Sequence, residues 1–272
     1  MKKQIQKRFL RNNALRLILI TTFIATPVLA QTAVEKGLEI AQKIESRDDG
    51  FIDSRVTLKM TLTNRNGETS TRELRLASLE TSDTSLGDKS LTVFDRPRDI
   101  RGTAFLSFTK ILDPDDQWLF LPALKRVKRI SSANKSGPFV GSEFAYEDLV
   151  SFEVEKYDFK WLRDEPCGEL QCFVLERTPR YAKSGYSRQV TWVDNQEYRI
   201  MRVDYYDRKA SLLKTLQQSG FKQYVGQYWR PSTMIMINQQ TGKQTQLIFE
   251  DYKFRTGVRE NDFTPGRLKR IR

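Results

Sequence analysis

The feature that most constrains the fold is an alternation of apolar and polar side chains with a period of two residues. Between residues 55 and 62 every second side chain is apolar, at Val56, Leu58, Met60 and Leu62. Successive side chains of a strand point to opposite faces, so this pattern predicts a half-buried β-strand. A turn sequence at 64–67 and a second alternating run at 68–79 predict the returning strand of a hairpin.

The same pattern continues along most of the chain. Further strands are predicted over residues 90–94, 102–109, 117–121, 127–130, 157–162, 173–177, 188–193, 200–206, 213–224, 233–238 and 245–254. Short turn sequences separate them, most clearly at 113–116, 194–195 and 241–242. No strand–helix–strand rhythm occurs, so the chain is predicted to be mostly β with minor α, in an antiparallel sheet of about eleven strands.

Two segments depart from the alternation. Val34, Leu38 and Ala41 recur at helical spacing, which predicts an N-terminal helix over residues 32–47 that Asp48-Asp49-Gly50 ends. Residues 131–150 begin with a turn-rich stretch, reach Phe139, and include a short possible helix over 143–150. A loop this long in a compact β domain is more often functional than idle, so we interpret it as a lid or plug.

Residues 1–30 read as a secretory signal peptide. Six basic residues precede and flank a short apolar run, Leu17–Ala25, and the small residue Ala30 stands at the expected cleavage point. An uncleaved anchor is the alternative, but the run is shorter than the roughly 20 apolar residues that cross a bilayer. We therefore predict cleavage after Ala30, a periplasmic protein, and a single domain over residues 31–272.

Charge and composition exclude several classes of function. Without the leader, 40 basic and 34 acidic residues remain, a net charge of +6. This charge suits solubility and a transient contact with anionic membrane surfaces, and the periplasm argues against a nucleic-acid partner. The sequence contains no histidine, which eliminates Ser-His-Asp and Cys-His catalysis and histidine-based metal sites. We predict no enzyme activity, no metal and no cofactor.

Three smaller motifs have simpler explanations than chemistry. Asp113, Asp115 and Asp116 lack the Gly and the bidentate Glu of a calcium loop, and a turn around Pro114 explains them better. Ser142 lacks the second glycine of a nucleophile elbow. Two readings of Cys167 and Cys172 stay open: a disulfide, which an oxidising compartment favours, or two free buried thiols.

Aromatic residues are numerous for a soluble sheet, and two interpretations of them stay open. They fill an ordinary packed core, or they line an apolar cavity that the chain's own side chains leave partly empty. On the second reading the candidates for lipid contact are Phe94, Phe105, Trp118, Phe120, Phe139, Phe144, Tyr146 and Trp192. The basic run 125–129 is either a solvated strand edge or a rim whose Arg126, Lys128 and Arg129 contact lipid head groups.

Three segments together resemble a known family. They are LTVFDRPRDIRGT at 91–103, QWLFLPALKRVKRI at 117–130 and GSEFAYEDL at 141–149. Their order and spacing are similar to those of the outer-membrane lipoprotein-sorting proteins, a LolA-like family. The family commonly has Asp where Glu143 stands here.

The resemblance implies an open antiparallel half-barrel whose concave face is covered by helices and loops. It also implies a carrier of lipid or lipoprotein acyl chains between membranes, with an RND-type inner-membrane transporter as a possible partner. A fold-level likeness does not establish a cargo, so a second hypothesis stands beside the first: an accessory module of such a transporter that carries nothing. In either case we expect a monomer.

Overall fold

The computed structural model describes residues 31–81, 83 and 86–271. The predicted leader, with its cleavage after Ala30, lies outside the described residues. Among the helices of the described residues, none has the length and apolar character that a membrane span requires. The assignment of residues 31–272 to one domain stays a prediction.

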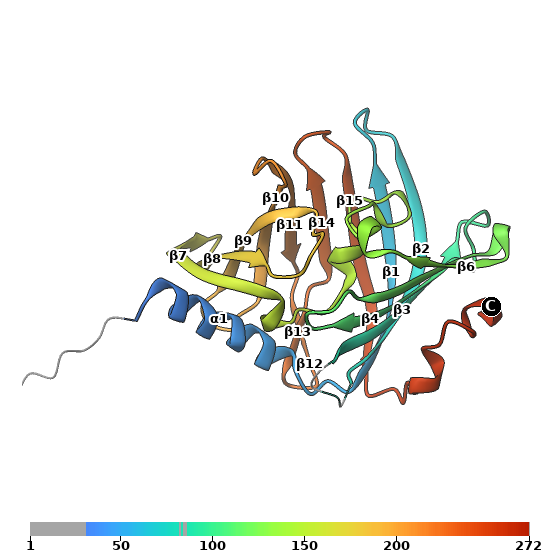
Figure 1. The fold of residues 1–272 in the computed structure, drawn as a ribbon, viewed down its shortest axis with the longest axis horizontal. Helices are drawn as coiled ribbons and strands as arrows, with labels where there is room; N and C mark the ends of the chain where they lie inside the picture. The colour runs from blue at the N-terminus through green and yellow to red at the C-terminus, as the bar shows by residue number, and fades with distance from the viewer. Residues whose placement is uncertain (1–30, 82, 84–85, 272) are drawn as a thin grey trace, which may run out of the picture. The chain divides into compact units, whose positions relative to one another are not determined.

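Thirteen strands of the described residues form one antiparallel sheet that does not close into a barrel (Figure 1). The first six are β1 (Asp53–Thr63), β2 (Thr69–Leu79), β3 (Leu86–Arg96), β4 (Ala104–Lys110), β5 (Asp116–Leu121) and β6 (Arg126–Ile130). The others are β7 (Tyr157–Cys167), β8 (Leu170–Pro179), β9 (Tyr186–Asp194), β10 (Ile200–Asp207), β11 (Leu212–Ser219), β14 (Thr233–Asn238) and β15 (Gln244–Phe254). The predicted mostly-β, open antiparallel architecture is confirmed, with thirteen strands in place of the predicted number of about eleven.

The order of the strands across the sheet is β6-β5-β4-β3-β2-β1-β15-β14-β11-β10-β9-β8-β7. Two meanders therefore meet where the first strand pairs with the last, with Met60 opposite Leu247. Strands β6 and β7 follow each other in the chain but form the two opposite edges of the sheet. This arrangement decides the path of the segment that joins them.

The predicted N-terminal helix is α1 (Ala33–Asp48). The Thr32 hydroxyl accepts a hydrogen bond from the Glu35 backbone N–H, and the Glu35 carboxylate accepts one from the Thr32 N–H, which forms a capping box. Ile40 and Ala41 are buried and pack on the strands near the β7 edge. The helix thus covers one end of one face of the sheet.

We call the face that carries Met60, Phe105 and Met236 the inner face, and the opposite one the outer face. The inner face holds the largest apolar cluster, to which eleven strands contribute. The outer face of β3 to β6 is covered by the C-terminal segment, residues 258–271, whose Val258, Phe263 and Leu268 are buried. The alternation pattern did not predict this cover, because the segment is irregular apart from two short 3₁₀ turns, η6 (Glu260–Asp262) and η7 (Leu268–Arg270).

Several strands are longer than predicted: β3 was expected over 90–94, β7 over 157–162 and β8 over 173–177. Two further predictions differ in kind. The strand predicted over 213–224 ends at Ser219, because Gly220 turns the chain with a φ of +64° and lies so close to Ser232 that a Cβ would meet its hydroxyl. Beyond the turn, β12 (Lys222–Tyr224) and β13 (Tyr228–Arg230) form a separate two-stranded sheet.

The prediction of a short helix over residues 143–150 is wrong. Extended backbone at Ala145 interrupts it, and only one 3₁₀ turn, η4 (Tyr146–Leu149), forms.

Cys167 and Cys172 form a disulfide at the end of the β7–β8 hairpin, with Cα atoms 5.8 Å apart. This confirms the disulfide interpretation and excludes the alternative of two free thiols. The bond closes only a short loop, so it constrains the hairpin locally.

Candidate functional site

The connection between β6 and β7 has to cross the sheet, because these strands are its opposite edges. It does so over the inner face (Figure 1). We call its first part, residues 131–150, the plug. Besides η4, the plug contains two 3₁₀ turns, η2 (Ser132–Asn134) and η3 (Phe139–Gly141). Because the segment crosses the inner face, it covers the sheet as we expected of a lid or plug.

The plug folds back on itself as a tight loop. Val140 and Gly141 have positive φ values of 47° and 78°, which reverse the chain direction. The Phe139 N–H donates to the Phe144 carbonyl at 2.7 Å, and Pro138 bridges to Ala145. The reversal leaves Phe139 2 % and Phe144 3 % exposed, both directed at the sheet.

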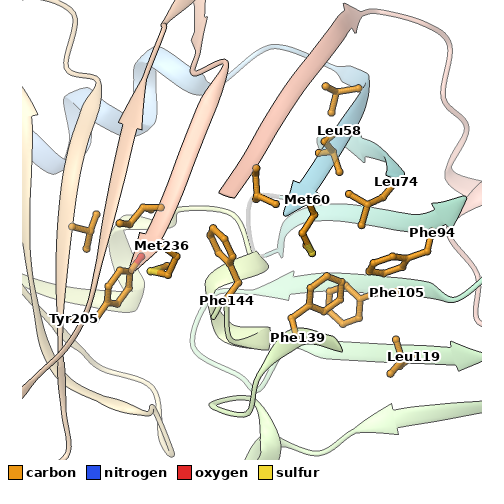
Figure 2. Packing of buried hydrophobic residues seen from close by; sticks show 14 of the residues in the cluster. Leu58, Met60, Leu74, Phe94, Phe105, Leu119, Phe139, Phe144, Tyr205 and Met236 are labelled. Atoms are coloured by element: carbon orange, nitrogen blue, oxygen red, sulfur yellow. The ribbon is translucent and has the colours of Figure 1, made fainter. Parts of the chain in front are cut away.

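The aromatic side chains of the plug pack against aromatic side chains of the inner face. The Phe139 ring centroid lies 5.2 Å from that of Phe105, 5.8 Å from that of Phe94 and 5.7 Å from that of Tyr146. The Phe105 and Tyr146 centroids are 5.4 Å apart. Figure 2 shows Phe139 next to Phe105, with Phe94 nearby, and Phe144 between Met60 and Met236. These contacts fall within the range in which aromatic pairs attract each other.

The structure divides the eight residues that the sequence offered for lipid contact. Phe94, Phe105, Phe139, Phe144 and Tyr146 lie together in the inner-face cluster. Trp118 and Phe120 point to the outer face, where the C-terminal segment covers them.

Trp192 also points to the outer face. Its ring lies 4.5 Å from the guanidinium carbon of Arg202, and its indole N–H donates to the Glu165 carboxylate. Lipid contact by Trp118, Phe120 and Trp192 stays a prediction, and these residues are not part of the candidate site.

The inner face in this conformation is packed. The plug's own aromatic side chains occupy the space that the cavity interpretation reserved for a ligand, and Phe94, Phe105 and Met236 are at most 1 % exposed. Among the described residues, these aromatic side chains therefore form a packed core and do not line an empty cavity. A ligand on this face would have to replace the plug.

A buried ion pair anchors the plug to the sheet. The Lys214 ammonium lies 2.6 Å from the Asp148 carboxylate, and both side chains are at most 5 % exposed. The same ammonium donates to the Glu143 carbonyl at 2.9 Å, and the Tyr186 hydroxyl donates to Asp148 at 2.7 Å. Burial is the main reason that the pKa of Tyr186 is raised, and the nearby Asp148 adds to the shift. Each buried charge thus has an opposite charge and further hydrogen bonds.

A second anchor joins the plug to the turn before β9. The Glu147 carboxylate accepts hydrogen bonds from the Gly185 N–H at 2.8 Å and from the Ser184 hydroxyl at 2.9 Å. Burial raises the pKa of Glu147, and the neighbouring Asp148 raises it further, whereas the two hydrogen bonds act in the opposite direction.

A third group of contacts holds the tip of the plug. The Glu143 carboxylate accepts from the Asn238 amide at 2.8 Å, and the Glu143 N–H donates to the Thr245 hydroxyl at 3.0 Å. The Arg72 guanidinium donates to the Val140 carbonyl at 2.5 Å.

Sequence reasoning missed all of these anchors. A usable signal existed in one case, because Lys214 lies two residues before the inner-face residue Leu216 in β11 and therefore on the same face of the strand.

Two hollows open on the surface. One of about 370 Å³ lies where the plug meets the ends of β1, β2 and β15, and its lining includes Leu62, Gly141 and Glu143. The other, about 400 Å³, lies on the outer face beside Trp192, Arg202 and Ile235. The first marks the place where solvent reaches the border between the plug and the inner face.

The predicted basic rim lies on the edge strand β6. Arg126, Lys128 and Arg129 are all exposed, and Arg129 pairs with Asp116 of the adjacent strand. Their predicted contact with lipid head groups is not tested by this arrangement.

The open antiparallel sheet and its N-terminal helix place the chain in the class of LolA-like folds. A LolA superfamily protein from Nitrosomonas europaea, 22 % identical, superposes with a TM-score of 0.68 over 86 % of this chain and 98 % of its own. At that identity the likeness shows the fold alone.

Closer relatives identify the family. The chain is 56 % identical to an outer membrane lipoprotein-sorting protein domain from Vibrio parahaemolyticus, with a TM-score of 0.85 over 87 % of this chain and 99 % of that one. A DUF1329 family protein from Desulfovibrio piger is 31 % identical, with a TM-score of 0.83 and the same coverage. The chain belongs to this outer-membrane lipoprotein-sorting family with a LolA-like fold.

A family model also matches the chain, whereas curated proteins do not. A family model described as "-like: Uncharacterized protein" matches residues 87–270. Among curated proteins, none matches the chain.

Proposed function

We propose that the chain binds acyl chains of lipids or lipoproteins on its inner face and carries them between the membranes of the periplasm, without catalysing a reaction. The acyl chain takes the place of the plug's aromatic side chains, and the plug moves aside to admit it. The observation that carries this proposal is the plug itself: an irregular crossing segment, not a strand or helix of the core, covers the apolar inner face.

The energies of such an exchange are of matching size. Exposing the side chains of Phe139, Phe144 and Tyr146 costs about 5–9 kcal/mol, at about 1.5–3 kcal/mol each. Burying about 14 methylene groups of one acyl chain returns about 11 kcal/mol, at about 0.8 kcal/mol each. One acyl chain of ordinary length can therefore compensate the exposure of these three side chains.

A plug that can be locked shut provides the test. The 3.0 Å bond from the Glu143 N–H to the Thr245 hydroxyl places the two Cα atoms within about 7 Å, which is close enough for a disulfide. In a Glu143→Cys/Thr245→Cys variant purified from the periplasm, native mass spectrometry should detect acyl-lipid adducts when the new bond is reduced and lose them when it is oxidised.

The unaltered protein, treated with the same reductant, controls for opening of the native Cys167–Cys172 bond. The proposal would be contradicted if the oxidised and the reduced forms of the variant carried the same fraction of acyl-lipid adducts. It would also be contradicted if the unaltered protein carried no adduct.

A second candidate is a non-carrier accessory module of an RND-type transporter. The specific observation in its favour is the packed inner face, where Phe139 and Phe144 of the plug are buried in the same cluster as the sheet residues. A bare mass under all conditions, together with in vivo cross-links to an identified RND-type transporter, would favour this module over the carrier.

A further inference from the structure

We propose that the β6 edge of the protein is a docking surface for anionic phospholipid bilayers. This surface, here called the basic end, comprises Lys125, Arg126 and Lys128 of the β6 region, Lys269 and Arg270 of η7, and Leu124. The inference goes beyond the proposed carrier function, because docking on a membrane does not require that the plug moves.

The cations of the basic end are exposed and lack acidic partners. Lys125, Arg126 and Lys128 are all exposed, and none of the three forms an ion pair with another residue that the structure describes. The one acidic side chain paired with this strand, Asp116, is shared by Arg129 and Lys110. The positive charge of residues 125–128 is therefore not neutralised within the described protein.

The tertiary structure adds cations from the other end of the chain. Val127 of β6 packs in one outer-face cluster with Leu268 and Ile271, so η7 lies against this strand. Figure 1 shows the C-terminal segment beside β6. Lys269 and Arg270 are exposed there, and neither has an ion-pair partner within the described residues. Two separate segments thus bring five cations to one end of the sheet.

An exposed leucine stands directly beside these cations. Leu124 ends the turn η1 (Pro122–Leu124) and is 62 % exposed, the largest fraction among the exposed large hydrophobic residues described. Lys125 follows it with a left-handed φ of +50° and turns the chain into β6. An apolar side chain flanked by lysines and arginines is typical of surfaces that insert at the boundary between lipid head groups and acyl chains.

The shape of the basic end favours a bilayer over a folded partner. The two surface hollows described above are lined by residues of neither β6 nor η7, so neither of them offers a binding site at this end. Charged side chains along an edge strand also oppose the addition of another strand. A bilayer offers phosphates in any lateral position and an apolar layer for Leu124, so it matches both features together.

Vesicle flotation with the mature protein tests the proposal. We expect binding to vesicles of equal parts phosphatidylglycerol and phosphatidylethanolamine, and little to phosphatidylcholine alone. Binding should weaken as salt is raised, because the Debye length falls from about 10 Å at 0.1 M to about 3 Å at 1 M. Each cation near an anionic surface contributes about fivefold, so Lys125→Gln/Arg126→Gln/Lys128→Gln should lower partitioning about a hundredfold.

A variant with the same change in net charge provides the control. Arg55→Gln/Lys59→Gln/Lys253→Gln removes three exposed cations from β1 and β15, about five strands away across the sheet. We expect this variant to bind vesicles within about twofold to threefold of the unaltered protein, because net charge alone acts weakly through salt. A second variant, Leu124→Ser, should reduce binding while its salt dependence remains.

Equal losses in the two triple variants would overturn the proposal, as would binding that ignores salt. Absence of vesicle binding would also overturn it and would favour an acidic protein partner. Native mass spectrometry of the first triple variant separates the two proposals, since loss of docking with acyl adducts retained concerns the basic end alone.

Discussion

The plug and the C-terminal segment each cover one face of the same sheet, but they are attached in different ways. Buried charges hold the plug on the sheet: the side chains of Lys214 and Asp148 are at most 5 % exposed, and so is Glu147. The C-terminal cover instead buries Leu268 and Phe263 and keeps its charged groups near the surface. Apolar burial dominates on the outer face, whereas the inner face mixes apolar burial with desolvated charge.

This difference bears on which cover can be exchanged. Taking two charges out of water costs much of what their attraction returns, so a buried ion pair positions a segment without adding much net stability. Apolar burial has no such cost. We infer that the C-terminal cover is permanent, whereas the plug is accurately placed and can be displaced by a ligand.

The largest expected effect comes from breaking the anchor of the plug. Lys214→Met leaves the Asp148 carboxylate buried without its cation, which should lower the free energy of unfolding by about 3–5 kcal/mol. Urea unfolding followed by tryptophan fluorescence measures it. The control is Lys269→Met on the exposed surface of the other cover, for which we expect a change within about 0.5 kcal/mol. If both variants lost a similar, small amount of unfolding free energy, the plug would not be held by buried charge in the way that distinguishes it from the C-terminal segment.

An intermediate effect separates stability from binding. Leu268→Ala and Phe139→Ala each remove a buried apolar side chain, one from each cover, and each should cost about 3 kcal/mol of unfolding free energy. Only Phe139→Ala also weakens the plug's occupation of the inner face, so it alone should raise the fraction of protein with acyl adducts in native mass spectrometry. If Leu268→Ala raised that fraction equally, neither cover would be the specific gate.

The smallest effect is a pH dependence of opposite sign in the two covers. On the plug side, burial raises the pKa of Glu147 above its ordinary 4.5. The folded state therefore holds this proton more tightly than the unfolded state, and stability should fall as pH rises above 4.5. Glu147→Gln should flatten that fall by about 1 kcal/mol in urea titrations at successive pH values.

On the outer side, Asp53 holds Thr256 and Gly257, the two residues directly before the C-terminal segment. Burial alone would raise the pKa of Asp53, but hydrogen bonds from Thr256 and Gly257 outweigh it and lower the pKa below 3.8. Its contribution is complete above pH 3.8 and is lost as pH falls through the lowered value. Asp53→Asn should therefore lose about 1 kcal/mol at neutral pH and lose less on acidification. If Glu147→Gln and Asp53→Asn changed the pH dependence of stability in the same direction, the opposite pKa shifts of the two carboxylates would be contradicted.

Local patterns predicted the elements well where a short stretch of chain decides them. The strand predicted over 233–238 is β14 without change, and the helix predicted over 32–47 differs from α1 by one residue at each end. Thr32 and Glu35 form their capping box within one turn, so no distant contact is needed. The errors fell at Gly220 and in the plug, where contacts with distant segments decide the backbone.

The candidate site was predictable only in part. The irregular segment at 131–150 stood out because it broke the alternation, and its Phe139, Phe144 and Tyr146 do lie in the inner-face cluster. Its anchors were not predictable, since Lys214 is 66 residues from Asp148 in the chain. The sequence contains no local pattern that pairs two such positions.

By itself the sequence determined where the strands run, where the helix begins, and that one long segment belongs to neither. Tertiary structure decided which side chains meet, because the alternation says only that neighbours point in opposite directions. Phe105 and Leu106 are both apolar and both buried, yet one packs under the plug and the other under the C-terminal segment. The pairing of β1 with β15 put β6 and β7 at opposite edges, and the connection between them therefore had to cross the inner face.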